Sequence, residues 1–224
     1  MSGRFGESHS TSSHRKSSSR MISSLISRAS IIVALPLVLL ACSTDPYAAK
    51  PLTAEELNLI RNGEGLMRVT TIDNEADSLL LRSKSTFFVD EDLRSEEYAI
   101  LAERMVATVT DPSQDGVGIA GPQVGILRRV VAVQRFDKEG EPFEVYPNVH
   151  IEPVGDERQI GSEGCLSVPD MRGEVERYSK IRLMYTDPVS LEPVEELVEG
   201  FTAVIFQHEC DHLDGILYID RIVE

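Results

Sequence analysis

Near the C-terminus the sequence reads Phe206-Gln207-His208-Glu209-Cys210-Asp211-His212. Two histidines four residues apart lie on one face of a helix, so both imidazoles can reach one metal ion. Glu209 follows the first histidine and can stay unligated, as an acid–base group beside the metal. The alternative is a chance match, with two surface histidines on an acidic helix. Because the chain has only five histidines, the spacing favours a metal site.

A zinc metalloprotease is the first function that this spacing suggests. A metzincin would carry its third histidine where this chain has Tyr218, and a thermolysin-like enzyme needs a downstream glutamate on another helix. Only 12 residues follow His212, so we expect the third ligand upstream, at Cys165. A thiolate, two imidazoles and one open position make a sensible catalytic site. The alternative for Cys165 is a small buried core residue.

A glycine-rich stretch, Gly116-Val117-Gly118-Ile119-Ala120-Gly121-Pro122-Gln123-Val124-Gly125, occurs earlier in the chain. Its first six residues match the dinucleotide pattern G-x-G-x-x-G, but no buried strand precedes it and no βαβ unit follows. We therefore reject a nucleotide site. The remaining interpretations are a loop that lets a ligand approach its backbone, with Gln123 offering an amide, and a tight turn before a strand.

The hydrophobic pattern predicts an α+β fold. A helical stripe over residues 90–109 indicates one core-facing helix, which Asp111-Pro112 ends; the stripe comprises Leu93, Tyr98, Leu101, Met105 and Val109. Short strands are predicted at 129–133, 143–146, 181–185 and 194–198. We expect mostly antiparallel sheets around a central metal-binding helix.

Charge limits the possible partners. The chain has 224 residues and a net charge of −15, which argues against nucleic acid bound through a basic surface. The first 41 residues hold five basic residues against Glu7 alone, which leaves 17 basic and 36 acidic residues downstream, a net charge of −19. Three cysteines cannot form a disulfide framework.

The N-terminus resembles a bacterial lipoprotein signal. Residues 29–41 form an apolar run that is too short to span a membrane, and Leu39-Leu40-Ala41-Cys42 resembles a lipobox with Cys42 as the lipidated residue. A start at Met21 would give a signal of ordinary length. The alternatives are an organellar transit peptide and a buried apolar strand. The resulting prediction is a membrane-anchored lipoprotein, with a cytoplasmic protein as the alternative.

We therefore divide the chain into a signal peptide at 1–41, a tether at 42–74 and a metallohydrolase domain at 75–224. The tether should contain one short helix over residues 53–60, because Thr53 followed by Glu56 forms a capping box. Asn62-Gly63 and Gly65 should end this helix.

Three segments in order closely resemble the motifs of peptide deformylases: Gly116-Val117-Gly118-Ile119-Ala120-Gly121-Pro122-Gln123, Glu163-Gly164-Cys165-Leu166-Ser167 and Gln207-His208-Glu209-Cys210-Asp211-His212. The resemblance spans about residues 75–224 and implies a deformylase-like fold. Gly121 stands where alanine is commoner in the family.

The resemblance implies that Cys165, His208 and His212 hold a metal, ferrous iron in family practice, with Zn²⁺, Ni²⁺ or Co²⁺ able to replace it. Ligand type alone would suggest zinc. Glu209 would take a proton from the attacking water and pass it to the leaving amine. The amide of Gln123 and the backbone N–H of Leu166 would stabilise the oxyanion.

The implied reaction is removal of the N-formyl group from an N-terminal methionine of a peptide or nascent chain. The backbone of Gly118 would bind this peptide in extended form, and Arg172 would lie near the substrate backbone. Candidates for the methionine pocket are Val117, Phe201, Val204 and Ile205. Asp211 is a candidate to pair with Arg177, and Cys210 is expected to be a packing residue.

A second alternative is a catalytically retired, lipid-anchored binding protein. Every expected ligand, base and oxyanion donor is present, which favours an active enzyme. Deformylation acts on nascent chains in the cytosol, whereas the N-terminus indicates export. The sequence makes no prediction about the oligomeric state.

Overall fold

The structure is a computed structural model that describes residues 47–63, 65–114 and 116–223. All of them belong to one compact unit that runs from Ser43 to Glu224. The predicted signal segment and Cys42 lie outside the described residues. In the part of the chain that is described, no helix combines the length and hydropathy required to cross a bilayer.

Within the described residues, eight strands form three antiparallel sheets. The first sheet has the order β1-β2-β3 (Gly118–Ala120, Val130–Gln134, Phe143–Pro147), and the second has the order β4-β7-β8 (His150–Pro153, Lys180–Thr186, Pro193–Glu199). Strands β5 (Arg158–Cys165) and β6 (Val168–Tyr178) form a long hairpin. The helices are α1 (Ala54–Arg61), α2 (Glu75–Leu81), α3 (Asp90–Leu93), α4 (Glu96–Val109) and α5 (Gly200–Leu213), with 3-10 turns η1 (Gly121–Val124) and η2 (Tyr218–Asp220).

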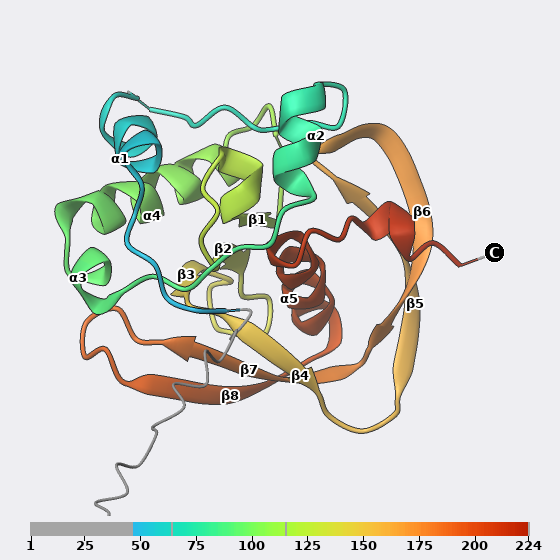
Figure 1. The fold of residues 1–224 in the computed structure, drawn as a ribbon. Helices are drawn as coiled ribbons and strands as arrows, with labels where there is room; N and C mark the ends of the chain where they lie inside the picture. The colour runs from blue at the N-terminus through green and yellow to red at the C-terminus, as the bar shows by residue number, and fades with distance from the viewer. Residues whose placement is uncertain (1–46, 64, 115, 224) are drawn as a thin grey trace, which may run out of the picture. The chain divides into compact units, whose positions relative to one another are not determined.

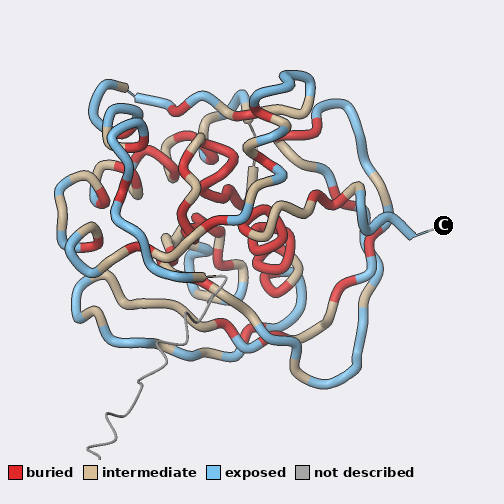
Figure 2. Tube along the Cα trace, viewed as in Figure 1, coloured by how far each residue is buried: buried red, intermediate tan, exposed pale blue. Residues whose placement is uncertain are grey.

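Helix α5 lies at the centre, with the three sheets around it (Figure 1). Its residues from Ile205 to Leu213 are all buried, as the tube in Figure 2 shows, because a helix that is enclosed on most sides must lose water all round. Phe206 is fully buried and meets Tyr146 of β3 edge to face, with ring centroids 5.0 Å apart. The prediction of an α+β fold with antiparallel sheets around the histidine helix is confirmed.

The predicted helix over residues 90–109 is two helices, so that prediction was wrong in its extent. Ser95 begins α4 as its N-cap, because its side chain accepts a hydrogen bond from the backbone N–H of Tyr98. The chain therefore turns between α3 and α4. The predicted apolar stripe is buried throughout, from Leu93 to Val109.

The described part of residues 42–74 does not behave as a tether. Thr53 and Glu56 form the predicted capping box of α1. However, Leu52, Ile60 and Met67 are buried in the same apolar cluster as α4. The segment packs on the domain because these apolar side chains lose more water-exposed area there than they would in an extended linker.

The hairpin β5–β6 is not predictable from the apolar pattern of the sequence. Its strands are rich in charged residues and lack a run of alternating apolar side chains. The inner face instead buries Glu163 and Arg177 beside Val175, and the two charged side chains pair with each other. Apolar periodicity cannot reveal a strand whose buried face is largely ionic.

Candidate metal centre and active site

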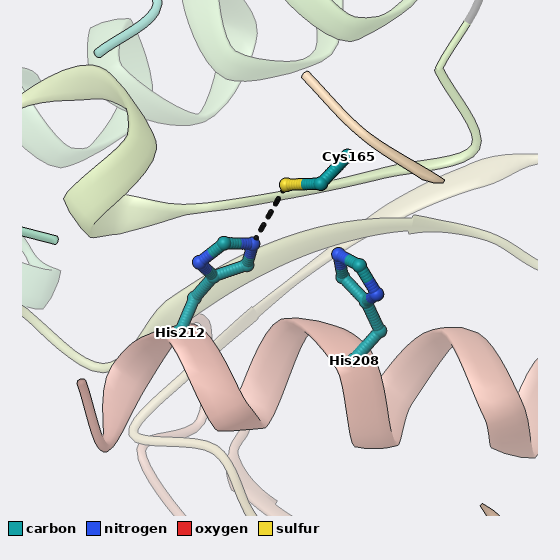
Figure 3. A group of neighbouring side chains, drawn as sticks. All are labelled: Cys165, His208 and His212. Carbon is teal, nitrogen blue, oxygen red and sulfur yellow. Dashed lines mark hydrogen bonds between the residues drawn. The ribbon is translucent and has the colours of Figure 1, made fainter. Parts of the chain in front are cut away.

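Three potential metal ligands converge from two elements. Cys165 ends β5, whereas His208 and His212 lie one turn apart on α5. One ligand atom from each residue lies within 4.8 Å of the other two. The Sγ atom of Cys165 is 3.1 Å from Nε2 of His212, the contact drawn in Figure 3. A thiolate with two imidazoles is a donor set that fits Zn²⁺ or Fe²⁺.

Glu163 orients the first histidine. Its Oε2 lies 2.8 Å from Nδ1 of His208, which leaves Nε2 of that ring free to bind a metal, as carboxylates commonly arrange for metal-binding histidines. Burial would lower the pKa of His208, but hydrogen bonding to Cys165 and Glu163 outweighs burial and raises the pKa to about 10. Burial lowers the pKa of His212, and the neighbouring His208 lowers it further.

Glu209 lines the cavity described below and lies close to Gly118. Its side chain is buried, and its Oε2 has no hydrogen-bond partner among the described residues. Burial raises the pKa of Glu209 to about 7. A carboxyl group whose pKa is near neutrality is suited to both accepting and donating a proton.

The amide of Gln123 is fixed in orientation. Its Oε1 accepts a hydrogen bond from the backbone N–H of Ala120 at 2.7 Å, while its Nε2 donates to Oγ of Ser167 at 3.3 Å and lies 3.5 Å from Sγ of Cys165. The amide N–H group therefore faces the metal centre. Leu166 follows Cys165 directly and also lines the cavity.

A cavity of about 590 Å³ opens beside the metal centre. It brings together most of the residues that the sequence nominated: Val117, Gly118, Gln123, Cys165, Leu166, Arg172, Phe201, Val204, Ile205, His208 and Glu209. His212 does not line it. Gln114, Asp170 and Met171 also line the cavity, and no sequence motif pointed to them. Phe201 and Arg172 are exposed, whereas Ile205 is buried.

His208 contacts a buried ionic network that the sequence predicted only in part. The expected pair of Asp211 with Arg177 is present, and Arg177 also binds both carboxylate oxygens of Glu163 at 2.8 and 2.9 Å. Glu163 stands in the Glu-Gly-Cys segment, so its position beside a nominated ligand was the available signal. Cys210 is a free, buried thiol in an apolar cluster, as expected for a packing residue.

Comparison with known proteins gives one consistent result. The family model described as Polypeptide deformylase matches residues 67–224. A peptide deformylase of Leptospira biflexa is 38% identical over 150 residues, which cover 64% of this chain and 82% of that protein.

Solved structures agree. The peptide deformylase of Thermotoga maritima matches with a TM-score of 0.62 and 34% identity, covering 72% of this chain and all of that one. A class I type b peptide deformylase of Acinetobacter baumannii bound to Met-Ala-Ser matches with a TM-score of 0.60 and 36% identity, over 70% of this chain and 98% of that one. The chain belongs to the polypeptide deformylase family.

Proposed function

We propose that this protein is a metal-dependent hydrolase that removes the formyl group from N-terminal formylmethionine. One observation carries the proposal. The side chains of Cys165, His208 and His212 converge on one point, and Glu209 and Gln123 border the same cavity. A zinc metalloprotease is the less favoured function, because the family membership and the upstream cysteine both point to a deformylase.

Cys165, His208 and His212 would hold a divalent metal, which when bound would supply Lewis acidity and make water a stronger nucleophile. Glu209 is placed to take the proton of the attacking water and to return it to the departing amine. Gln123 Nε2 and the Leu166 backbone N–H would donate to the developing oxyanion. Loss of one such donor commonly costs about 3–4 kcal/mol of transition-state stabilisation.

The substrate would add to the open edge of β1. Among the described strands β1 pairs with β2 alone, so its other edge at Gly118 can take an extended peptide by strand addition. Val117, Val204 and Ile205 would form the apolar pocket for the methionine side chain, with Phe201 at its rim, and Arg172 would lie near the peptide backbone. The Acinetobacter baumannii relative bound to Met-Ala-Ser supports a peptide substrate of this kind.

Formyl-Met-Ala-Ser turnover by the full-length chain, reconstituted anaerobically with Fe²⁺, tests this function. We expect turnover well above the metal-free background. Equal rates with and without metal would contradict the enzyme proposal and favour a retired binding protein. We also propose that the native metal is Fe²⁺. In parallel reconstitutions, turnover should be higher with Fe²⁺ than with Zn²⁺, Ni²⁺ or Co²⁺.

Two substitutions separate the roles of the site residues. Glu209→Ala should keep stoichiometric metal and lose most of the activity, because it removes the proton carrier alone. Cys165→Ala should lose the metal, because it removes a ligand. Metal analysis beside the turnover assay checks both, and full metal content with full activity in Cys165→Ala would contradict the ligand assignment.

We also propose that Cys42 is lipidated and anchors the protein to a membrane. The support is the sequence of the signal-like segment. Palmitate labelling and membrane fractionation of wild type and Cys42→Ala test it. Label on the wild type alone is the expected result, and an unlabelled wild type would favour the cytoplasmic alternative.

A further inference from the structure

A chain of alternating charges leads from the metal centre to the C-terminal segment. It begins at His208, whose Nδ1 pairs with Glu163, and it continues through Arg177 to Asp211. It ends at Arg221, whose Nε and Nη2 bind the two oxygens of Asp211 at 2.6 and 2.7 Å. Arg221 therefore lies four contacts away from a nominated metal ligand, well outside the cavity.

The inner members of this chain are withdrawn from water. Glu163, Arg177 and Asp211 are at most 8% exposed, whereas the side chain of Arg221 is 42% exposed. Buried charges need partners, because a lone buried carboxylate is strongly unfavourable. Arg221 gives Asp211 an arginine partner of its own, while Arg177 pairs with Glu163 and also contacts Asp211.

Removal of Arg221 would leave Glu163 and Asp211 to share Arg177. In the intact network Arg177 directs Nε and Nη2 to Glu163 and Nη1 to Asp211. Without Arg221, the negative charge of Asp211 would attract Arg177 more strongly. The hydrogen bonds from Arg177 to Glu163 would then weaken. Glu163 is the residue that orients the His208 ring, so the disturbance would reach a metal ligand.

The C-terminal segment holds Arg221 in place. Ile222 forms a β-bridge with Val175 of β6, and the N–H of Val223 donates to the carbonyl of Glu174 at 2.9 Å. An added Cβ at Gly173 would lie 2.5 Å from Ile222, so the isoleucine occupies the space above that glycine. The segment thus docks on the hairpin that also carries Glu163 and Cys165.

We propose that Arg221 is a positioning residue for the metal centre: it balances Asp211 so that Arg177 and Glu163 hold the His208 ring in its ligating orientation. The proposal rests on the metal site of the proposed function. Metal affinity should therefore depend on Arg221, although its side chain is half-exposed and does not line the cavity.

Co²⁺ affinity of the full-length chain tests the proposal, measured by chelator competition and by the visible absorption of cobalt bound to a thiolate. Removal of a group that hydrogen-bonds to a metal-binding histidine commonly weakens metal affinity by about 10- to 100-fold. Because Arg221 is distant from His208 and half-exposed, we expect Arg221→Gln to weaken Co²⁺ binding by about tenfold. Arg221→Lys keeps the charge but loses the two-pronged contact, so it should lie between wild type and the glutamine variant.

Two controls separate charge balance from general loosening. Arg158→Gln breaks an ion pair with Glu176 on the same hairpin, whose side chains are 40% and 44% exposed, and removes one positive charge outside this network. Ile222→Ala removes the side-chain contact with Gly173 but keeps the backbone contacts of the segment with β6 and the charge of Arg221. Both should bind Co²⁺ within about twofold of wild type, even where thermal unfolding shows a lower Tm.

The outcomes are distinct. Co²⁺ affinity of Arg221→Gln within twofold of wild type would overturn the proposal, as would equal weakening in Ile222→Ala or a lysine variant weaker than the glutamine variant. If wild type itself fails to bind Co²⁺, the proposed metal site fails rather than the role of Arg221.

Discussion

The methyl group of a Gly118→Ala variant would collide with the nominated proton carrier. A Cβ built at Gly118 lies 2.5 Å from Oε1 of Glu209 and 2.8 Å from Cγ2 of Ile205. Ordinary van der Waals contact begins at 3.4 Å, so the carboxylate oxygen has to move by about 0.9 Å if it alone gives way. Gly118 is buried and pairs with Val133 of β2, so its backbone has little room to shift instead.

A displacement of about 1 Å at a reacting group can cost on the order of 100-fold in rate, which corresponds to about 2.7 kcal/mol of barrier. We therefore expect kcat for formyl-Met-Ala-Ser to fall by roughly two orders of magnitude. The metal content should remain stoichiometric, because the clash involves Glu209 and not the three nominated ligands.

Steady-state kinetics with parallel metal analysis measure both quantities. Gly161→Ala is the matched control, because Gly161 also lies in a strand, has no positive φ, and has no atom within 4 Å of an added Cβ. This control should retain wild-type kcat. A Gly118→Ala enzyme with kcat within threefold of wild type would refute the reasoning, and so would loss of metal from that variant.

Three further variants test the fold and the site. Phe206→Ala should lower the free energy of unfolding by about 3–5 kcal/mol in a denaturant titration, because this ring is fully buried; Val189→Ala, at a side chain that is 91% exposed, should leave it unchanged. Asp137→Asn should lower stability by about 1–2 kcal/mol at pH 7, because its hydrogen bonds from Arg135 hold the pKa of Asp137 below the ordinary 3.8. A carboxyl group with a lowered folded-state pKa stabilises the fold above its unfolded-state pKa, so the difference between wild type and Asp137→Asn should shrink as the pH falls below about 4, and a constant difference would contradict this origin. Cys210→Ala should keep stoichiometric metal by metal analysis, because this thiol packs in an apolar cluster, and metal loss would mean that the wrong cysteine was nominated.

Local patterns predicted much of this protein correctly. The stripe from Leu93 to Val109 identified a buried helical face, and Thr53 with Glu56 identified a cap, because both depend on contacts within a few turns of one helix. The break at Ser95 was missed, since a serine between Leu93 and Tyr98 is compatible with either a helix interior or an N-cap. The hairpin β5–β6 was missed because pairing among its charged residues replaces apolar burial.

The packing of residues 47–74 could not be predicted from composition. Isolated apolar residues such as Leu52 and Met67 give no periodic signal in a polar stretch. Their burial depends on a hydrophobic surface that α4 and β2 form from residues more than 30 positions away. Only the folded arrangement reveals that this surface exists.

By itself, the sequence determined the metal-ligand candidates and the family. His208 and His212 share a helical face by the geometry of the α-helix alone, and three short motifs in order were specific enough to indicate the rest. Only the tertiary structure decided how those ligands are supported. The contacts from His208 to Glu163 and from Arg177 to Asp211 join residues 45 and 34 positions apart, and no local rule relates such positions. The helix periodicity therefore fixed which two histidines can share a metal, whereas long-range packing of the hairpin and the C-terminal segment brought Cys165 to them and fixed the charges around His208.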